Sequence, residues 1–233
     1  MITAADAAPP AIGQHGVVPL RKRPTPARPA TPSDTASVAY TERLAELAGA
    51  TWKRWLDVQR PYRWNLRRLN LGRVLDLGCG IGRNLAHLDG NGFGIDHNPT
   101  SVAVARARGL SASTPDEFLA GPHAHPGAFD SLLIAHVLEH MPQEAARALL
   151  SRYLGYVRPG GRVVLICPQE RGWASDPTHV RFVDARALEE LCGEVGILVE
   201  RSSSFPFPRW AGHAFPYNEF VVVARLPQGP DAP

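Results

Sequence analysis

Short apolar runs alternate with segments of helical spacing along most of the chain, and this alternation predicts the fold. Buried strands are predicted over 73–77, 92–95, 131–135 and 162–167, with a weaker strand over 110–113. Helices are predicted from the turn at 78–82 through Leu88, and over 99–108, 143–157 and 184–195. This rhythm is typical of an α/β fold with a doubly wound, mostly parallel sheet and helices on both faces.

The alternation stops after Ile197. Segments 197–203 and 219–226 are both strand-like, and no helical pattern separates them, so we expect an antiparallel terminal pair. The sheet then has seven strands, of which the last is antiparallel. Residues 204–218, between the two segments, are rich in aromatic residues and proline and are too long for a hairpin turn. We interpret them either as a substrate loop or as a flap over the sheet edge.

The first part of the chain has a different composition. Residues 1–38 are rich in proline and alanine and contain no aromatic residue, which predicts a disordered leader. From Tyr40 onward, apolar residues at helical spacing predict N-terminal helices within 39–70 that brace the sheet, with an interruption at Pro61. The length favours one domain, over 39–233, behind the leader.

Charge and cysteine content narrow the class of protein. The formal charge is +3, and the leader carries +2 of it, so the remainder lacks the basic field of a general nucleic-acid binder. Cys79, Cys167 and Cys192 show no CxxC spacing, which favours a reducing cytoplasm over a disulfide framework. We expect no membrane span, because the chain has no apolar run of about 18 residues. The sequence does not indicate an oligomeric state.

A glycine-rich turn follows the first predicted strand. Gly78, Gly80 and Gly82 have the order GxGxG, which lets the backbone approach a ligand closely. Asp76 precedes them at the strand end, and Asp96 ends the next strand, where a carboxylate can accept both hydroxyls of a ribose. A nicotinamide dehydrogenase would instead carry GxGxxG, so this pattern favours another nucleoside ligand.

Four segments together, LDLGCGIG, GIDHNP, FDSLLIAHVLEHM and RPGGRVVLI, resemble the motif series of class I S-adenosylmethionine (AdoMet)-dependent methyltransferases over about residues 70–200. The resemblance implies AdoMet as cofactor. It places Asp76 and the glycine turn, Cys79 included, along the methionine part, Asp96 and His97 beside the ribose, and the turn 113–116 with Thr114 beside adenine. Further cofactor contacts implied are Ala135 and His136 near the sulfonium and Arg63 on the methionine carboxylate.

Methyl transfer to a hydroxyl requires that a proton be removed, and two segments offer groups for this step. In HVLEHM, His136, Glu139 and His140 have the spacing i, i+3, i+4 and would face one direction if the segment is helical. Asp176 and His179 lie in a predicted loop between the fifth strand and the last helix. We predict catalytic roles for His140, His179, His136 and Asp176, with a histidine as general base.

The Glu-His pair also resembles the ExxEH motif that binds a divalent metal in ubiquinone-pathway O-methyltransferases and small-RNA 3′-end methyltransferases. Here His136 stands at the first position, which weakens the inference of Mg²⁺ because Mg²⁺ prefers oxygen ligands. A mixed site for Mg²⁺, Mn²⁺ or Zn²⁺ would comprise Glu139, His140, His136 and His179. The alternative is a metal-free site, since many relatives without metal have a Glu-His pair here.

These features predict an O-methyltransferase that acts on a hydroxyl of a sugar, a glycan or another small molecule. The histidines and carboxylates suit a hydroxyl that needs activation, and aromatic side chains can stack on pyranose faces. The same aromatic loop also suits a phenolic or polyketide acceptor, and an amine is a further alternative. A protein or RNA methyltransferase and a non-catalytic AdoMet-binding protein are rival classes.

Overall fold

The computed structural model describes residue 42 and residues 59–228. The predicted leader at 1–38 and the helices predicted before residue 59 lie outside these residues. Within the described part, no helix is long and apolar enough to cross a bilayer.

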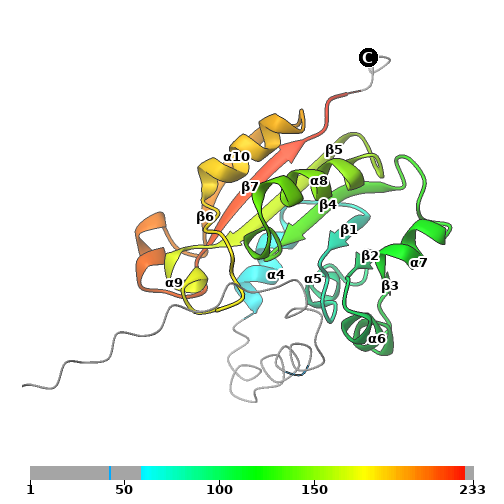
Figure 1. Cartoon of the computed structure of the whole chain (residues 1–233), viewed down its shortest axis with the longest axis horizontal. Helices are drawn as coiled ribbons and strands as arrows, with labels where there is room; N and C mark the ends of the chain where they lie inside the picture. The colour runs from blue at the N-terminus through cyan, green and yellow to red at the C-terminus, as the bar shows by residue number, and fades with distance from the viewer. Residues whose placement is uncertain (1–41, 43–58, 229–233) are drawn as a thin grey trace, which may run out of the picture.

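Seven strands form one sheet in the order β3-β2-β1-β4-β5-β7-β6 (Figure 1). Every pairing from β3 through to β5 is parallel, and β7 pairs antiparallel with both β5 and β6. Six strands therefore run in one direction and β7 runs against them, which confirms the predicted fold class. The bounds are β1 Val74–Leu77, β2 Gly92–Ile95, β3 Ala112–Ser113, β4 Phe129–Ala135, β5 Val157–Pro168, β6 Leu198–Phe205 and β7 Glu219–Arg225.

Helices cover both faces of the sheet (Figure 1). The largest apolar cluster joins one face to the helices α7, α8 and α10, and a second cluster joins the other face to α4 through Leu66. A third, smaller cluster joins α5 and α6 to β3. The bounds are α4 Arg60–Arg67, α5 Arg83–His87, α6 Pro99–Ala107, α7 Pro115–Ala120, α8 Gln143–Leu154, α9 Glu170–Trp173 and α10 Ala185–Glu194, with 3-10 helices η1 Leu138–His140 and η2 Arg209–His213.

The predicted elements differ from the observed ones mainly around the fifth strand. β5 begins at Val157, five residues earlier than predicted, because the segment RPGG belongs to the strand and not to a turn. Gly160 has a positive φ of 67°, and the β4–β5 register shifts between Phe129 and Ser131, so an irregular stretch of strand replaces the predicted turn. The preceding helix ends at Leu154, three residues earlier than predicted. The short helices α7 and α9 were not predicted.

Two buried amides anchor the aromatic segment between β6 and β7. Gln169 and Asn218 are both inaccessible to solvent. The backbone N–H of Gln169 donates to the backbone carbonyl of Asn218 at 2.9 Å, and the Asn218 side-chain amide donates to Gln169 Oε1 at 2.9 Å. Asn218 Oδ1 also accepts from the Phe207 N–H at 2.9 Å. Both ends of the segment are thus tied to the edge of the sheet where β5 ends.

The packing of β2 against the glycine turn can be tested at Gly94. A Cβ at this position would lie 2.5 Å from Cys79 Sγ and 2.9 Å from Leu85 Cδ1. We expect Gly94→Ala to lower the free energy of unfolding by about 1–3 kcal/mol, because the added methyl overpacks a closed site. Urea denaturation measures this change.

Gly155→Ala is the matched control, because no atom lies within 4 Å of a Cβ added there and its φ is −61°. Its stability should change by less than about 0.5 kcal/mol. Equal stability of the two variants would contradict the close packing at Gly94.

Candidate active site

The turn after β1 places three glycines in the left-handed region. Gly78, Gly80 and Gly82 have φ values of 71°, 52° and 82°. Gly82 is the N-cap residue of α5, and the Gly78 N–H donates to the Ile95 carbonyl at 2.7 Å. The backbone therefore bends sharply across the ends of β1 and β2 without side chains at its three tightest positions. A ligand can therefore approach the backbone of this turn closely.

Asp76 lies beneath this turn as a fully buried carboxylate. Neither of its side-chain oxygens has a hydrogen bond of ordinary geometry among the described residues. Burial raises the pKa of Asp76 to about 7, although the nearby Asn84 and Arg83 side chains oppose this effect. A buried acceptor without a partner is costly, so this carboxylate is suited to receive a cationic group of a ligand.

Asp96 joins the glycine turn to the end of β2. Its Oδ2 accepts from the Gly80 N–H at 2.8 Å, and its Oδ1 accepts from the Asn98 N–H at 2.8 Å. Two ionised oxygens have about four lone-pair sites, so acceptor capacity for ribose hydroxyls remains. His97 Nδ1 lies 3.7 Å from Asp96 Oδ1, and the His97 side chain is half exposed.

The other predicted cofactor residues occupy several places. Ala135 is buried at the end of β4, and Arg63 lies half-buried on α4. Thr114 caps α7 through a capping box with Glu117, in which its hydroxyl accepts the Glu117 N–H. Cys79 packs into the space that Gly94 leaves, which gives it a structural contact. Ligand contacts for these residues stay predictions.

The segment HVLEHM is not a regular helix. His136 has a positive φ of 59°, and only Leu138–His140 form a 3-10 turn. The expectation that His136, Glu139 and His140 share a helix face is therefore wrong. His136 Nε2 lies 2.8 Å from Glu219 Oε1 on β7, and His136 Nδ1 lies 3.4 Å from Glu139 Oε1. Both ring nitrogens of His136 thus face carboxylates.

These carboxylates control the ionisation of the buried pair. Burial opposes the charge on His136, but the contacts with Glu139 and Glu219 outweigh it and raise the pKa of His136 to about 9. Burial likewise opposes the charge on Glu139, which is fully inaccessible, yet His136 holds the pKa of Glu139 below its ordinary value. A protonated imidazole is no base at neutral pH, so this geometry disfavours His136 as the proton acceptor.

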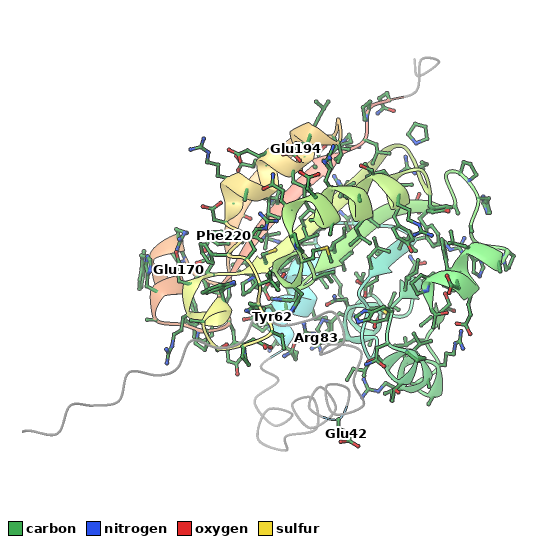
Figure 2. The ribbon with its side chains drawn as sticks, in the orientation of Figure 1. Glu42, Tyr62, Arg83, Glu170, Glu194 and Phe220 are labelled. Carbon is green, nitrogen blue, oxygen red and sulfur yellow. The ribbon has the colours of Figure 1, made fainter. Side chains whose placement is uncertain are left out.

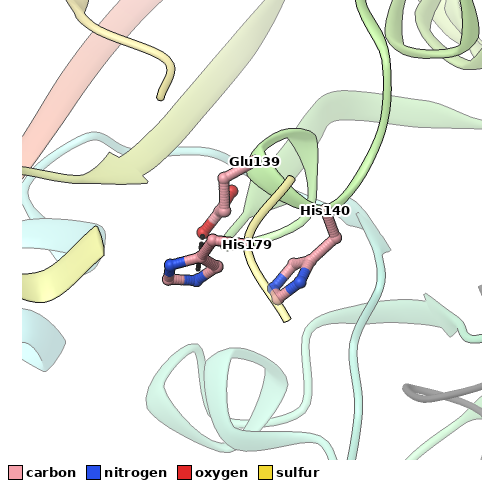
Figure 3. A group of neighbouring side chains, drawn as sticks. All are labelled: Glu139, His140 and His179. Atoms are coloured by element: carbon pink, nitrogen blue, oxygen red, sulfur yellow. Dashed lines mark ion pairs between the residues drawn. The ribbon is translucent and has the colours of Figure 1, made fainter. Parts of the chain in front are cut away.

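His140 and His179 meet beside Glu139, although they come from segments 39 positions apart in the chain (Figure 3). His140 Nδ1 lies 3.1 Å from the Thr178 carbonyl oxygen, and His179 Nδ1 lies 2.7 Å from the Trp173 carbonyl oxygen. A carbonyl only accepts, so each Nδ1 is assigned the proton and each Nε2 keeps its lone pair. Burial lowers the pKa of His140, which favours this neutral form.

One ligand atom from each of Glu139, His140 and His179 lies within 4.8 Å of the others. His179 Nε2 is 3.9 Å from Glu139 Oε1, a buried oxygen that has no hydrogen bond among the described residues. The other oxygen, Glu139 Oε2, accepts from Cys167 Sγ at 3.5 Å. One nitrogen from each imidazole and one carboxylate oxygen therefore lie close together, and this set of donors fits a divalent metal.

Asp176 is linked to this group through Thr178. Its Oδ1 accepts from the Thr178 N–H at 2.9 Å and from the Thr178 hydroxyl at 2.7 Å. Thr178 in turn presents its carbonyl to His140. The structure thus gives Asp176 contacts that shape the loop, while its predicted catalytic role stays a prediction.

Three residues of this region were missed in the sequence. Glu219, the partner of His136, stands 83 positions after it and carried no local signal.

Tyr62 on α4 and Arg83 on α5 lie near each other (Figure 2). Burial raises the pKa of the Tyr62 phenol well above its usual range, Glu219 raises it further, and Arg83 opposes the rise. The Tyr62 hydroxyl donates to the Tyr217 carbonyl at 2.6 Å, which ties α4 to the aromatic segment.

Comparison with known proteins assigns this fold and site to a class. Residues 48–201 match the model of a family described as a methyltransferase domain. The chain belongs to this family, which confirms the predicted class I methyltransferase relationship.

Individual relatives agree with that class. The chain is 32% identical over 157 residues to a ubiquinone biosynthesis O-methyltransferase of Paracidovorax citrulli, an alignment that covers 56% of this chain and 63% of the relative. The chain thus spans about three fifths of the length of the curated relatives it matches.

Two solved structures show the same fold at low identity. Magnesium protoporphyrin IX methyltransferase of Synechocystis PCC 6803, solved with bound SAH, has a TM-score of 0.58 at 17% identity over 83% of this chain and 97% of its own. A SAM-dependent methyltransferase of Archaeoglobus fulgidus has a TM-score of 0.57 at 18% identity over 74% of this chain and 99% of its own.

The buried Asp76 carboxylate predicts how stability depends on pH. Its pKa is about 7 in the folded chain and about 3.9 in an unfolded chain. As the pH rises between these values, the unfolded state loses this proton first, so the free energy of unfolding falls. We expect Asp76→Asn to remove this fall and to make the ligand-free protein more stable than the native chain at pH 8, as measured by urea denaturation.

Asp89→Asn is the control, because the Asp89 side chain is largely exposed. Its profile should match that of the native chain. A native profile that stays flat from pH 4 to pH 8 would show that the Asp76 carboxylate is not held in this unfavourable environment.

Proposed function

We propose that the protein is an AdoMet-dependent O-methyltransferase that acts on a hydroxyl of a small-molecule acceptor, with a divalent metal at Glu139, His140 and His179. One observation carries the proposal. A Cβ at Gly78 would lie 2.3 Å from Val137 Cγ2, so the glycine turn touches the segment that carries Glu139 and His140. The groups suited to bind the methyl donor therefore lie next to the groups suited to remove a proton.

Several contacts support AdoMet as the donor. The uncompensated Asp76 carboxylate suits the methionine ammonium, and Asp96 suits the ribose hydroxyls. The glycine turn lets the methionine part lie close to the backbone. The ends of β1 and β2 are adjacent, because Leu77 pairs with Ile95, so one nucleoside ligand can span both carboxylates.

The chain's own residues prepare the metal ligands. The carbonyl of Thr178 holds His140, and the carbonyl of Trp173 holds His179, so that each Nε2 lone pair is free. A bound divalent ion supplies a Lewis acid that makes an acceptor hydroxyl easier to deprotonate. In this proposal His140 and His179 act as ligands, whereas the predicted alternative makes one of them a general base without a metal.

The relatives favour a hydroxyl acceptor, because the name of the Paracidovorax citrulli protein describes an O-methyltransferase. A small phenolic molecule suits this comparison and the aromatic side chains of the segment between β6 and β7. A saccharide acceptor stays a prediction, since only the chemistry of the site and the same aromatic residues support it. Within the proposal, Asp176 positions the loop that carries Thr178 and His179.

Transfer of the methyl label from radiolabelled AdoMet tests the activity. Pools of phenols, glycosides, amines, RNA and peptides serve as acceptors, and we expect label only in hydroxyl-bearing small molecules. His140→Ala should lower turnover by about 100-fold or more, because it removes a group that helps to deprotonate the hydroxyl. EDTA should lower native turnover similarly, and added divalent metal should restore it.

His125→Ala is the control, since His125 is exposed in a loop before β4. Its turnover should equal that of the native chain. Label found only in peptide or RNA would overturn the proposed acceptor class, and full turnover in EDTA would overturn the metal.

A further inference from the structure

The metal donors proposed above are rich in nitrogen, with two histidines and one carboxylate. Among the described residues, only Glu139, His140 and His179 bring three such groups together. Their free donor atoms are two imidazole nitrogens and one carboxylate oxygen. Glu219 lies close by, yet its Oε1 is held by His136 Nε2 at 2.8 Å and is not part of the group.

His136 stands beside this donor set but outside it. Its Nδ1 approaches Glu139 Oε1 at 3.4 Å while its Nε2 faces Glu219, so the ring bridges one carboxylate on η1 and one at the start of β7. The positive φ of His136 and the hydrogen bond from its N–H to the Ile166 carbonyl at 2.9 Å fix the backbone from which the ring projects. The bridge thereby withholds a second carboxylate, that of Glu219, from the metal.

The geometry points to a three-ligand site that selects a nitrogen-preferring transition ion of the Zn²⁺ or Co²⁺ class over Mg²⁺, with His136 as a positioning residue and not a ligand. This inference rests on the metal in the proposed function and goes beyond it in naming the class of ion. Imidazole ligands suit Zn²⁺ and its neighbours, whereas Mg²⁺ requires oxygen donors in near-octahedral geometry. Three protein ligands leave a position open for an acceptor oxygen.

Contacts behind the ligands support a built site. Cys167 Sγ donates to Glu139 Oε2, which leaves Oε1 as the oxygen that faces the histidines. The Val180 N–H donates to the Glu139 carbonyl at 2.8 Å, so the loop that carries His179 is fastened to the ligand it must meet. The donor atoms all lie within 4.8 Å of one another, whereas ligands at zinc bond lengths are roughly 3.3 Å apart, so binding would draw the three side chains together.

Binding of Co²⁺ to the metal-free full chain tests this inference without an acceptor. The visible absorption of bound Co²⁺ reports its ligands directly. We expect one Co²⁺ per chain, displaced by equimolar Zn²⁺ and retained in about a hundredfold excess of Mg²⁺. His140→Ala and His179→Ala should each abolish or change the spectrum, and the exposed His125→Ala should leave it unaltered.

A test of the role of His136 requires a variant that still folds. His136→Gln alone leaves Glu139 and Glu219 facing each other, so the double variant His136→Gln/Glu219→Gln removes the bridge together with both charges of the His136–Glu219 pair. We expect this double variant to keep the Co²⁺ spectrum of the native chain. Its Co²⁺ affinity should be weaker by about 10- to 100-fold, as is usual when a residue that contacts a metal ligand is replaced.

Displacement of Co²⁺ by Mg²⁺ at similar concentration, absence of Co²⁺ binding, or a double variant whose spectrum changes as in His140→Ala would each overturn the inference. Failure of the proposed function looks different. A chain that binds Co²⁺ as described and methylates no acceptor would overturn the methyltransferase activity and leave the metal selectivity in place.

Discussion

The common direction of the strands is the constraint on which every functional feature depends. Parallel pairing of β1 with both β2 and β4 fixes Asp76 opposite Gly94 and Leu133, so three strands end at one edge. Asp76, Asp96 and His136 all lie at that edge, although 60 positions separate the first from the last. A slip of one residue would reverse which face each side chain occupies and would separate these groups. The sheet's hydrogen bonds therefore set the geometry of the site before any side chain contributes.

Two buried carboxylates near this edge, Asp76 and Glu139, have pKa values that are shifted in opposite directions. The pKa of Asp76 rises because burial outweighs the opposing effects of Asn84 and Arg83, whereas the pKa of Glu139 falls because His136 more than offsets its burial. The first arrangement leaves a group that is stabilised only when a cation arrives. The second keeps a charged oxygen ready for a ligand at neutral pH. The protein thus uses the placement of one imidazole to separate the behaviour of two acids.

The strands and the glycine turn could be predicted from the sequence because their signals are local. Apolar runs mark β1, β2 and β4, and only glycine accepts the positive φ values of the turn without strain. The segment HVLEHM was predicted wrongly for the same reason, because its helical spacing is a local signal and the backbone of His136 is not helical. The partner of His136, Glu219, is placed by the antiparallel register of β7, which no residue near His136 encodes. The carbonyls that orient His140 and His179 are likewise invisible in side-chain patterns.

The reversed direction of β7 gives the edge of the sheet an asymmetry. The other strands reach this edge with their last residues, but β7 reaches it with its first, Glu219. The segment that precedes β7 therefore enters the sheet from the side of the site, and Gln169 and Asn218 pin its ends. Residues inserted between Phe207 and Asn218 would lengthen this segment and leave the β6–β7 pairing in place. In evolutionary terms, this segment can change in length and composition while the strand register that places Asp76 and Asp96 stays constant.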